Sequence, residues 1–242
     1  KAFQQLIRHC SLPYKSKIQP INMKENISDW IIERNHQYLI LNKPAGIPTQ
    51  SDKTNDADLL TATQAYAKSD LKLINRLDRP VSGCVILAKS KNATVHLSNS
   101  KKIVKTYLAI VEPTLPKESD DLVAYLTKGT TNKAYLSEVE KEGYRKAEMS
   151  YKLIHTFDKY QLVEIELHSG RFHQIRVMLS HLGCPVKGDV KYGARRANKD
   201  RSIGLHAWKI ALDHPVHGKM EHYTSPLPDN DTIWKLAGDI LK

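Results

Sequence analysis

Apolar residues recur at every second position in several separate segments of this chain of 242 residues. Met149, Tyr151 and Leu153 alternate with polar residues, and segments 163–167 and 208–212 repeat the pattern. A period of two places such side chains on one face of a β-strand. Segments with helical spacing are fewer and do not alternate regularly with the strands. The pattern therefore favours an α+β fold over a doubly wound α/β sheet.

The remaining elements follow from apolar spacing and from turn-forming residues. Further strands or short apolar runs are predicted over 38–42, 71–74, 84–88 and 104–112. Helices are predicted over 58–68, 90–100 and 172–182, with Gly183 placed to end the third. A last helical stripe consists of Ile233, Leu236, Ala237 and Ile240. Residues 113–121 are predicted to form a loop, and residues 1–29 an N-terminal extension to a main domain over 30–242.

The charge of the chain points to a polyanionic partner. Lys and Arg number 37 against 26 Asp and Glu, which gives a formal net charge of +11. Residues 89–105 carry five lysines and no acid, and residues 187–201 carry six basic residues against two acids. This concentration of basic residues in two segments predicts a face that binds nucleic acid. A generally basic surface that keeps the protein in solution is the alternative.

Several classes of protein are disfavoured. No run approaches the ~18 apolar residues of a membrane span, and the first ten residues lack the apolar core of a secretory signal. The three cysteines, Cys10, Cys84 and Cys184, are scattered, which favours a reducing, cytoplasmic setting. Glycine-rich phosphate loops are absent from the sequence. Four histidines lie between residues 206 and 222, but Pro215 and Gly218 break any helical ligand spacing, so we expect no metal.

A polar loop at residues 75–83 is the first candidate for chemistry. Asp78 stands between Arg76 and Arg79 in sequence, and neighbouring cations keep a carboxylate ionised. Pro80 and Gly83 restrict and shape the backbone of the loop. A rigidly held carboxylate can act as a nucleophile or as a general base. An Asp–Arg pair that only secures a turn is the alternative.

Two further segments are candidates. At residues 170–176 a predicted strand gives way to a helix, on which His173 and Arg176 share one face. This face suits an anion, either a phosphate or the carboxylate of Asp78, unless its polar residues only face water. On the predicted strand 104–112, Lys105 and Tyr107 share a face. Tyr107 is either an ordinary sheet aromatic or a residue that stacks on a base or handles a proton.

In this order the three segments resemble the RluA-type family of RNA pseudouridine synthases. The similarity lies in Arg-Leu-Asp-Arg…Ser-Gly at 76–83, Lys-x-Tyr at 105–107 and Gly-Arg-x-His-Gln-Ile-Arg at 170–176. It extends to Asn-Lys-Pro-Ala-Gly at 42–46, Leu-Gly-Cys-Pro at 182–185 and Gly-Asp-x-x-Tyr-Gly at 188–193. Departures are Asn75, Pro80-Val81 and Met178. The resemblance covers about residues 36–224.

The resemblance implies a mixed, largely antiparallel sheet flanked by helices and loops with a central cleft, and a catalytic domain over 30–242. It implies isomerisation of uridine in RNA to pseudouridine, with Asp78 as the essential carboxylate, Arg176 as its cation and Tyr107 against the uracil. The target base would be flipped out, with Arg76 in its place. RNA contacts are predicted for Arg76, Arg79, Lys105, Arg171, His173, Gln174, Lys187, Lys191, Arg195 and Arg196.

The reaction implied by the resemblance has no redox step and no group donor, so no cofactor and no metal are expected. Ribosomal or transfer RNA is the expected partner of a cytoplasmic monomer. The alternative hypothesis is a catalytically silent RNA-binding or ribosome-assembly factor with the same fold.

Overall fold

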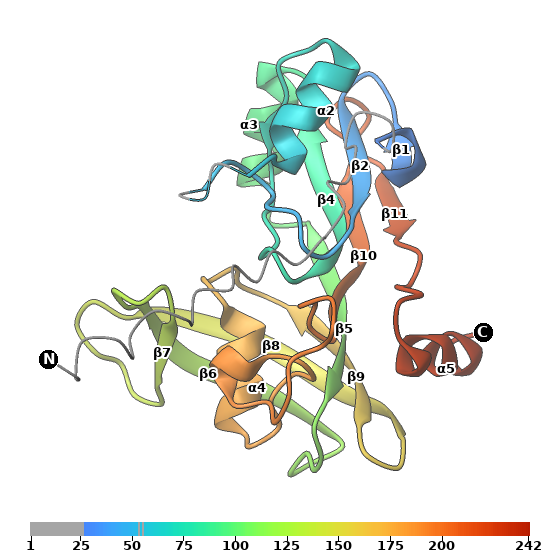
Figure 1. The fold of residues 1–242 in the computed structure, drawn as a ribbon. Coiled ribbons are helices and arrows are strands. Elements are labelled where there is room, and N and C mark those ends of the chain that lie inside the picture. The colour runs from blue at the N-terminus through green and yellow to red at the C-terminus, as the bar shows by residue number, and fades with distance from the viewer. Residues whose placement is uncertain (1–26, 53, 55) are drawn as a thin grey trace, which may run out of the picture.

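The computed structural model describes residues 27–52, 54 and 56–242 (Figure 1). Most of the predicted N-terminal extension, residues 1–26 with Cys10, lies outside the described residues. The boundary between residues 29 and 30 therefore stays a prediction.

Eleven strands form one mixed sheet within the described part of the chain. Their order across the sheet is β1-β2-β4-β10-β5-β9-β8-β6-β7, with β11 beside β10 and β3 beside β4. The strands are β1 (Ile31–Arg34), β2 (Tyr38–Lys43), β3 (Lys72–Leu73), β4 (Ser82–Ala88), β5 (Val104–Val111), β6 (Ser119–Lys128), β7 (Ala134–Ser137), β8 (Arg145–Thr156), β9 (Gln161–Leu167), β10 (Leu205–Asp213) and β11 (Met220–Thr224). The predicted α+β class with a largely antiparallel sheet is confirmed.

The centre of the sheet depends on the parallel pairing of β4 with β10. Gly83 lies opposite Ala207 at this crossing. Gly83 has φ +114°, and a Cβ atom on it would lie 2.3 Å from the carbonyl oxygen of Ala207. Only glycine allows both the positive φ and this close approach. On its other edge β10 pairs antiparallel with β5, so one strand joins the two halves of the sheet.

Four helices are distributed over the described residues: α2 (Leu59–Ala67), α3 (Lys91–Asn99), α4 (Gln174–His181) and α5 (Thr232–Ile240), with two short 3-10 turns at Ser28–Trp30 and Val190–Tyr192. Figure 1 shows α2 and α3 beside the half of the sheet that contains β2 and β4, and α4 against the half that contains β6 and β8. One apolar cluster runs through both halves and includes Leu41, Val85, Ile165 and Leu179.

The helices predicted over 58–68 and 90–100 are confirmed, and their capping residues explain their boundaries. The side chain of Asp58 accepts a hydrogen bond from the backbone N–H of Thr61 at 2.9 Å. Ser90 accepts one from the N–H of Ala93 at 3.1 Å. Each cap satisfies a backbone donor at the helix start that would otherwise lack a partner, which stabilises a helix by about 1 kcal/mol.

The predicted loop over 113–121 is wrong at its end, because β6 begins at Ser119. Acidic residues at 120 and 121 stand at the start of a strand whose inward face carries Leu122, Ala124 and Leu126 further along. An antiparallel strand tolerates this composition because one of its faces can meet water. The charged start of β6 therefore resembles a loop in sequence.

The predicted apolar stripe of the last helix is also partly wrong. Leu236 and Ile240 are 45% and 38% exposed, whereas Trp234 and Ala237 are buried. Trp234 packs in a small cluster with Leu108 of β5 and others from β9. The indole is the largest apolar side chain of α5, and its burial sets the rotation of the helix.

Candidate active site

A cleft of about 970 Å³ is lined by the three segments that the sequence analysis singled out. Its lining residues come from the 73–81 loop before β4, from Lys105 and Tyr107 of β5, and from the 170–176 segment that leads into α4. Because β4 and β5 both pair with β10, segments distant in sequence meet at one place. The predicted central cleft is thus present.

Asp78 and Arg176 form an ion pair in this cleft. Nη1 of Arg176 lies 2.8 Å from Oδ2 of Asp78. The side chain of Arg176 is 6% exposed and that of Asp78 is 26% exposed. The carboxylate can therefore be reached from the cleft, whereas the guanidinium behind it is sealed from water.

Asp189 holds the other side of the same guanidinium. Nε of Arg176 lies 2.6 Å from Oδ2 of Asp189, and Nη2 lies 2.9 Å from Oδ1. This is the planar, two-pronged contact that favours arginine over lysine. Burial alone would lower the pKa of Arg176, but hydrogen bonds and charges from Asp189 and Asp78 raise it above its ordinary value. Asp189 stands in the Gly-Asp-x-x-Tyr-Gly motif, but the motif alone did not indicate a place in the site.

His173 lies on the second side of Asp78. Its Nε2 is 3.4 Å from Oδ2 of Asp78, and its Nδ1 is 2.8 Å from the hydroxyl of Tyr192. That hydroxyl accepts a hydrogen bond from the N–H of Ala134, so its own hydrogen is available for Nδ1. Burial lowers the pKa of His173 to about 4. These contacts indicate that the His173 ring is neutral and carries its hydrogen on Nε2, which faces Asp78.

Tyr107 contributes a largely buried phenol to the cleft. It lies on β5 opposite Ile165 of β9, and its side chain is among the lining residues. Burial raises the pKa of Tyr107, and the negative charge of Asp78 raises it further. The phenol is therefore protonated at neutral pH.

Polar contacts from the β2 side of the sheet fix the loop that carries Asp78. The hydroxyl of Thr49 donates to the carbonyl of Leu77 at 2.6 Å and accepts from its N–H at 3.1 Å. The amine of Lys43 donates to the carbonyl of Arg79 at 3.4 Å and to two carbonyls of the turn after β2 at 2.9 Å. Burial lowers the pKa of Lys43 to about 7. Asp78 thus stands between two anchored residues.

The predicted flanking of Asp78 by Arg76 and Arg79 is wrong in space. The guanidinium of Arg79 pairs instead with Asp52 at 2.9 Å and with Asp56 at 2.5 Å. Arg76 is exposed and has no hydrogen-bond or ion-pair partner among the described residues. Successive residues of a turn project in different directions, so adjacency in sequence did not give contact. The cation beside Asp78 comes from α4.

Five of the predicted RNA-contacting cations line the cleft: Arg76, Arg79, Lys105, Arg171 and Lys191. Lys128, at the end of β6, lies there as well, with its amine 4.5 Å from the centre of the Phe172 ring. Lys128 lies outside both basic clusters of the sequence, so the distribution of charge along the chain did not predict its place in the cleft. The cleft therefore has a positively charged rim above an acidic side chain.

Three predicted RNA contacts lie outside the lining of the cleft: Lys187, Arg195 and Arg196. The amine of Lys187 donates to Asp231, the capping residue of α5, and to Asn198 at 2.9 Å. Lys187 is therefore a structural partner of α5, and its predicted contact with RNA stays a prediction. Arg195 is 90% exposed, with Glu112 at 3.7 Å.

Gln174 lines the cleft and is hydrogen-bonded inside the protein, and its predicted contact with RNA stays a prediction. It is 3% exposed, and its amide oxygen accepts hydrogen bonds from the Ser169 hydroxyl and from the N–H of Arg171. Its amide nitrogen donates to the carbonyl of Glu148. With both ends of the amide paired inside the protein, Gln174 closes the loop that precedes α4.

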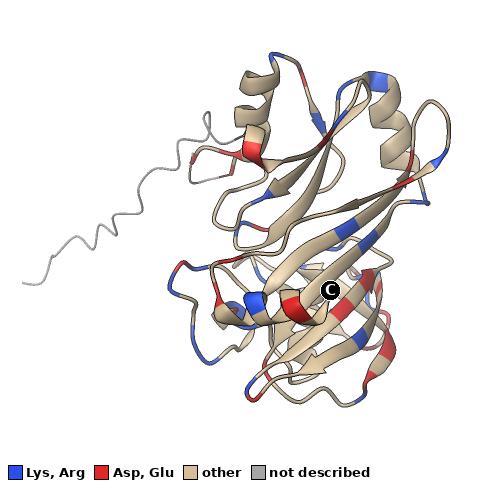
Figure 2. Cartoon of the chain, turned by 90° about the vertical axis from the view of Figure 1, so that its right-hand side faces the viewer, with Lys and Arg blue, Asp and Glu red and all other residues tan. Residues whose placement is uncertain are grey.

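The basic surplus does not cover the whole molecule. Figure 2 shows the side that lies on the right of Figure 1, where acidic segments stand among the basic ones.

Within the described residues, one group of side chains has the spacing of metal ligands: His214, His217 and Glu221. This group lies outside the lining of the cleft.

Comparison with known proteins decides the family. The model for the family described as RNA pseudouridylate synthase matches residues 37–181, which include Asp78, Tyr107 and Arg176. This chain belongs to the RNA pseudouridine synthases. The synthase is 30% identical over 212 residues to a "Ribosomal large subunit pseudouridine synthase C" of Rickettsia felis, covering 85% of this chain and 70% of the relative. It is 31% identical to a protein of the same name from Buchnera aphidicola, with 88% and 72% covered.

The fold of the synthase also matches a solved structure. Human RNA Pseudouridylate Synthase Domain Containing 4 superposes with a TM-score of 0.71 at 21% identity, covering 89% of this chain and 94% of the other. The synthase is an isomerase that acts on uridine in RNA, as the RluA-type resemblance implied. No helix within residues 27–242, positions 53 and 55 aside, has the length and apolar character needed to cross a membrane.

Proposed function

We propose that this synthase converts a uridine of large-subunit ribosomal RNA to pseudouridine, with Asp78 as the essential carboxylate. The observation that carries the proposal is the pair of Asp78 and Arg176 at 2.8 Å, with its carboxylate side open to the cleft. The names of the Rickettsia and Buchnera relatives support ribosomal RNA as the substrate. The expected location is the cytoplasm and the expected state a monomer.

The chemistry rearranges one nucleotide. The bond between C1′ of the ribose and N1 of uracil breaks, the uracil turns, and C5 bonds to C1′. The proton on C5 is lost while N1 gains one, so atoms and oxidation state balance and no co-reactant is needed. Asp78 acts either as a nucleophile on the sugar or as a base at its 2′ position. Its partial exposure of 26% is compatible with both roles.

Arg176 acts as the cation that keeps Asp78 ionised and directed into the cleft. Its side chain is sealed by the protein, and two of its nitrogens are occupied by Asp189. A buried guanidinium held on both sides cannot follow the substrate, so it fixes the carboxylate in one position. We assign Asp189 to the positioning of Arg176.

Tyr107 packs on the turned uracil and assists the transfer of the C5 proton. The raised pKa of its phenol supports a neutral ring that passes a proton through its hydroxyl rather than a resident phenolate base. The ring contributes stacking area as well. His173, neutral and stacked on Phe172 with ring centres 3.8 Å apart, completes the wall beside Asp78.

The uridine reaches Asp78 by leaving its stack, which costs roughly a few kcal/mol. Arg76 is exposed at the cleft two residues before Asp78, so we assign it to the place in the stack that the uridine vacates. Lys105, Lys128, Arg171 and Lys191 surround the opening and would bind phosphates. This arrangement supports recognition of RNA by shape and charge.

The test is to map pseudouridine across the total RNA of cells with and without the gene. A ribosomal site should be lost on deletion, restored by the wild-type gene and not restored by Asp78→Asn. Loss of a site in transfer RNA alone would reject the ribosomal substrate but keep the activity. If no site depends on the gene, or if Asp78→Asn restores the site, the catalytic role of Asp78 is rejected. Product formation by the purified protein separates it from a silent RNA-binding factor.

A further inference from the structure

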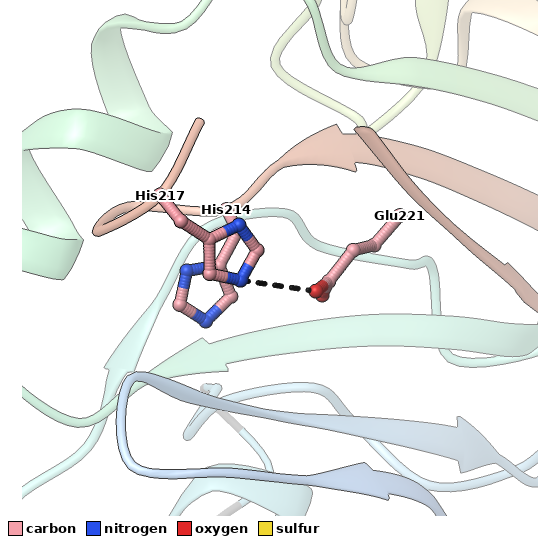
Figure 3. Close-up of side chains that lie close together, drawn as sticks. All are labelled: His214, His217 and Glu221. Atoms are coloured by element: carbon pink, nitrogen blue, oxygen red, sulfur yellow. Dashed lines mark ion pairs between the residues drawn. The ribbon is translucent and has the colours of Figure 1, made fainter. Parts of the chain in front are cut away.

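The turn between β10 and β11 brings together three side chains with metal-binding atoms, His214, His217 and Glu221 (Figure 3). Their ligand atoms all lie within 4.8 Å of one another. Nε2 of His217 is 3.5 Å from Oε1 of Glu221, and the rings of the two histidines stack with centres 3.8 Å apart. The proposed reaction uses none of the three.

A hairpin, not a helix, creates this group. The N–H of His214 donates to the carbonyl of Lys219, and the N–H of Gly218 donates back to the carbonyl of His214, both at 2.9 Å. Gly218, with φ +66°, allows the tight reversal. The turn places His217 over His214, and β11 then carries Glu221 back beside them. The absence of a metal was expected because Pro215 and Gly218 break any helical spacing of the histidines. A tight turn can bring the same side chains together without a helix.

Glu221 is held as ligating carboxylates are held in metal sites. Its Oε2 accepts hydrogen bonds from the hydroxyls of Tyr223, at 2.5 Å, and of Tyr38. Tyr38 is fully buried in β2, so this support is rigid. With Oε2 occupied by two phenols, Oε1 is left to face His217. Hydrogen bonds of this kind orient the side chains that bind a metal and raise the affinity for it.

The spacing fits a small divalent ion with one adjustment. Ligand atoms at 2.0–2.1 Å from one tetrahedral zinc lie about 3.4 Å apart, and the 3.5 Å between His217 and Glu221 matches this. The His214 ring is parallel to that of His217 and has to rotate to aim at the same point. Nδ1 of each ring accepts a long backbone contact, from Val216 at 3.2 Å and Lys219 at 3.3 Å. Binding through Nε2 moves a hydrogen to Nδ1 and gives up both contacts.

We propose that His214, His217 and Glu221 bind a divalent transition-metal ion of the zinc class, with water in the remaining position. Two imidazoles and a carboxylate are a donor set that suits zinc. His217 and Glu221 are 43% and 29% exposed, so the ion has access from solvent. The bound ion would clamp the β10–β11 turn to the Tyr38 side of β2.

The test is a zinc titration of the full chain after treatment with a chelator, with a chromogenic chelator as competitor. The wild type should bind one equivalent at this site. His217→Gln and Glu221→Gln should each weaken binding at least tenfold, and Tyr223→Phe, which leaves all three ligands in place, by about tenfold. His222→Ala is the matched control, because His222 is the exposed neighbour of Glu221 on β11 and is not in the group.

A second measurement locates the ion directly. In ¹⁵N-labelled protein, zinc should shift Nε2 of His214 and His217 and move their hydrogens to Nδ1, while His222 stays unchanged. The proposal is overturned if the wild type shows no saturable binding. It is equally overturned if binding survives unchanged in both His217→Gln and Glu221→Gln, which would place the zinc on other donors such as His9 and Cys10. Circular dichroism of each variant confirms that the comparison is between folded proteins.

Discussion

Oδ2 of Asp78 and Nη1 of Arg176 meet at 2.8 Å although 98 positions separate the two residues in the chain. Asp78 comes from the loop before β4 and Arg176 from α4, which lie with different halves of the sheet. The other side of the guanidinium is fixed by Asp189. The position of the carboxylate is thus determined by contacts from three separate parts of the fold.

Asp78→Asn should abolish pseudouridine formation while the fold and RNA binding persist. Asparagine keeps the shape but lacks the charge needed for attack on the sugar or for proton removal. We expect turnover to fall by roughly 10⁴-fold or more, which corresponds to about 5.5 kcal/mol in the barrier. Single-turnover assays with a ribosomal RNA fragment measure the loss, and filter binding supplies the control. Turnover near that of the wild type would remove Asp78 from the mechanism.

Arg176→Ala should destabilise the fold, because it leaves the carboxylate of Asp189, only 2% exposed, without a counter-charge. Removing one partner of a buried ion pair costs about 3–5 kcal/mol. Urea unfolding measures this cost. Arg176→Lys keeps the charge but cannot form the two-pronged contact, so its loss should be smaller. In the Asp189→Asn background the effect of Arg176→Ala should shrink, and equal effects in both backgrounds would contradict the pairing.

Tyr107→Phe should separate the two roles proposed for this residue. The ring remains to stack on uracil, but the hydroxyl that passes the proton is gone. We expect kcat to fall about 10²-fold with little change in RNA affinity. Tyr107→Leu should weaken both. An unchanged kcat in Tyr107→Phe would limit the residue to packing.

RNA affinity should depend steeply on salt, and Lys191 should contribute to that dependence. Each phosphate contact adds roughly 0.7–0.9 to the slope of log K against log salt concentration. Lys191→Ala at the rim of the cleft should reduce the slope by about that amount. Lys235→Ala on α5, outside the cleft lining, is the charge-matched control. Equal slopes for the two variants would argue against an RNA path along the cleft.

Stability should fall as the pH drops from about 6.5 toward 4. Burial lowers the pKa of both His173 and His206 to about 4, whereas a histidine in the unfolded chain titrates near 6.5. Between these values the unfolded state binds protons that the folded state does not, so protonation favours unfolding. Each histidine can add up to about 1.4 kcal/mol per pH unit to the slope of the free energy of unfolding.

Urea unfolding at a series of pH values checks this dependence. His206→Asn should flatten the slope between pH 4 and 6.5, because it removes one of the two buried imidazoles. His222→Ala, which removes an exposed imidazole, is the control for the loss of a histidine as such. A wild-type slope near zero across this window would contradict the assignment of neutral, buried rings.

Local patterns predicted the fold well where one face of an element is apolar. Strands β8, β9 and β10 were predicted from alternation, β2 and β5 as strands or apolar runs, and α2 as a helix with residues suited to capping at its start. The start of β6 was missed because acids occupy both of its faces there, and the apolar stripe of α5 was misplaced because Trp234 is buried while Leu236 and Ile240 are exposed. These errors share a cause, since burial is decided by the partner surface and not by the segment alone.

The site was found from residue types in a known order, not from local geometry. Contact between Asp78 and Arg176 was predicted, but the neighbours of Asp78 in sequence were assigned wrongly as its partners. Arg79 turns to the 52–56 loop, and Lys187 to α5. Asp189 belonged to the Gly-Asp-x-x-Tyr-Gly motif and to a basic cluster, but neither pattern indicated that it pairs with Arg176. The partner of a charged residue can be identified only when the course of the backbone between the two residues is known.

The pairing of β10 with β4 on one edge and β5 on the other has a consequence for substrate choice. Strand β4, which follows the Asp78 loop, and strand β5, which carries Tyr107, are joined through β10 by main-chain hydrogen bonds that resist their separation. The distortion needed for reaction is therefore borne by the RNA. Uridines in bulges, mismatches or loops, which unstack at the least cost, should be modified in preference to those in regular duplexes.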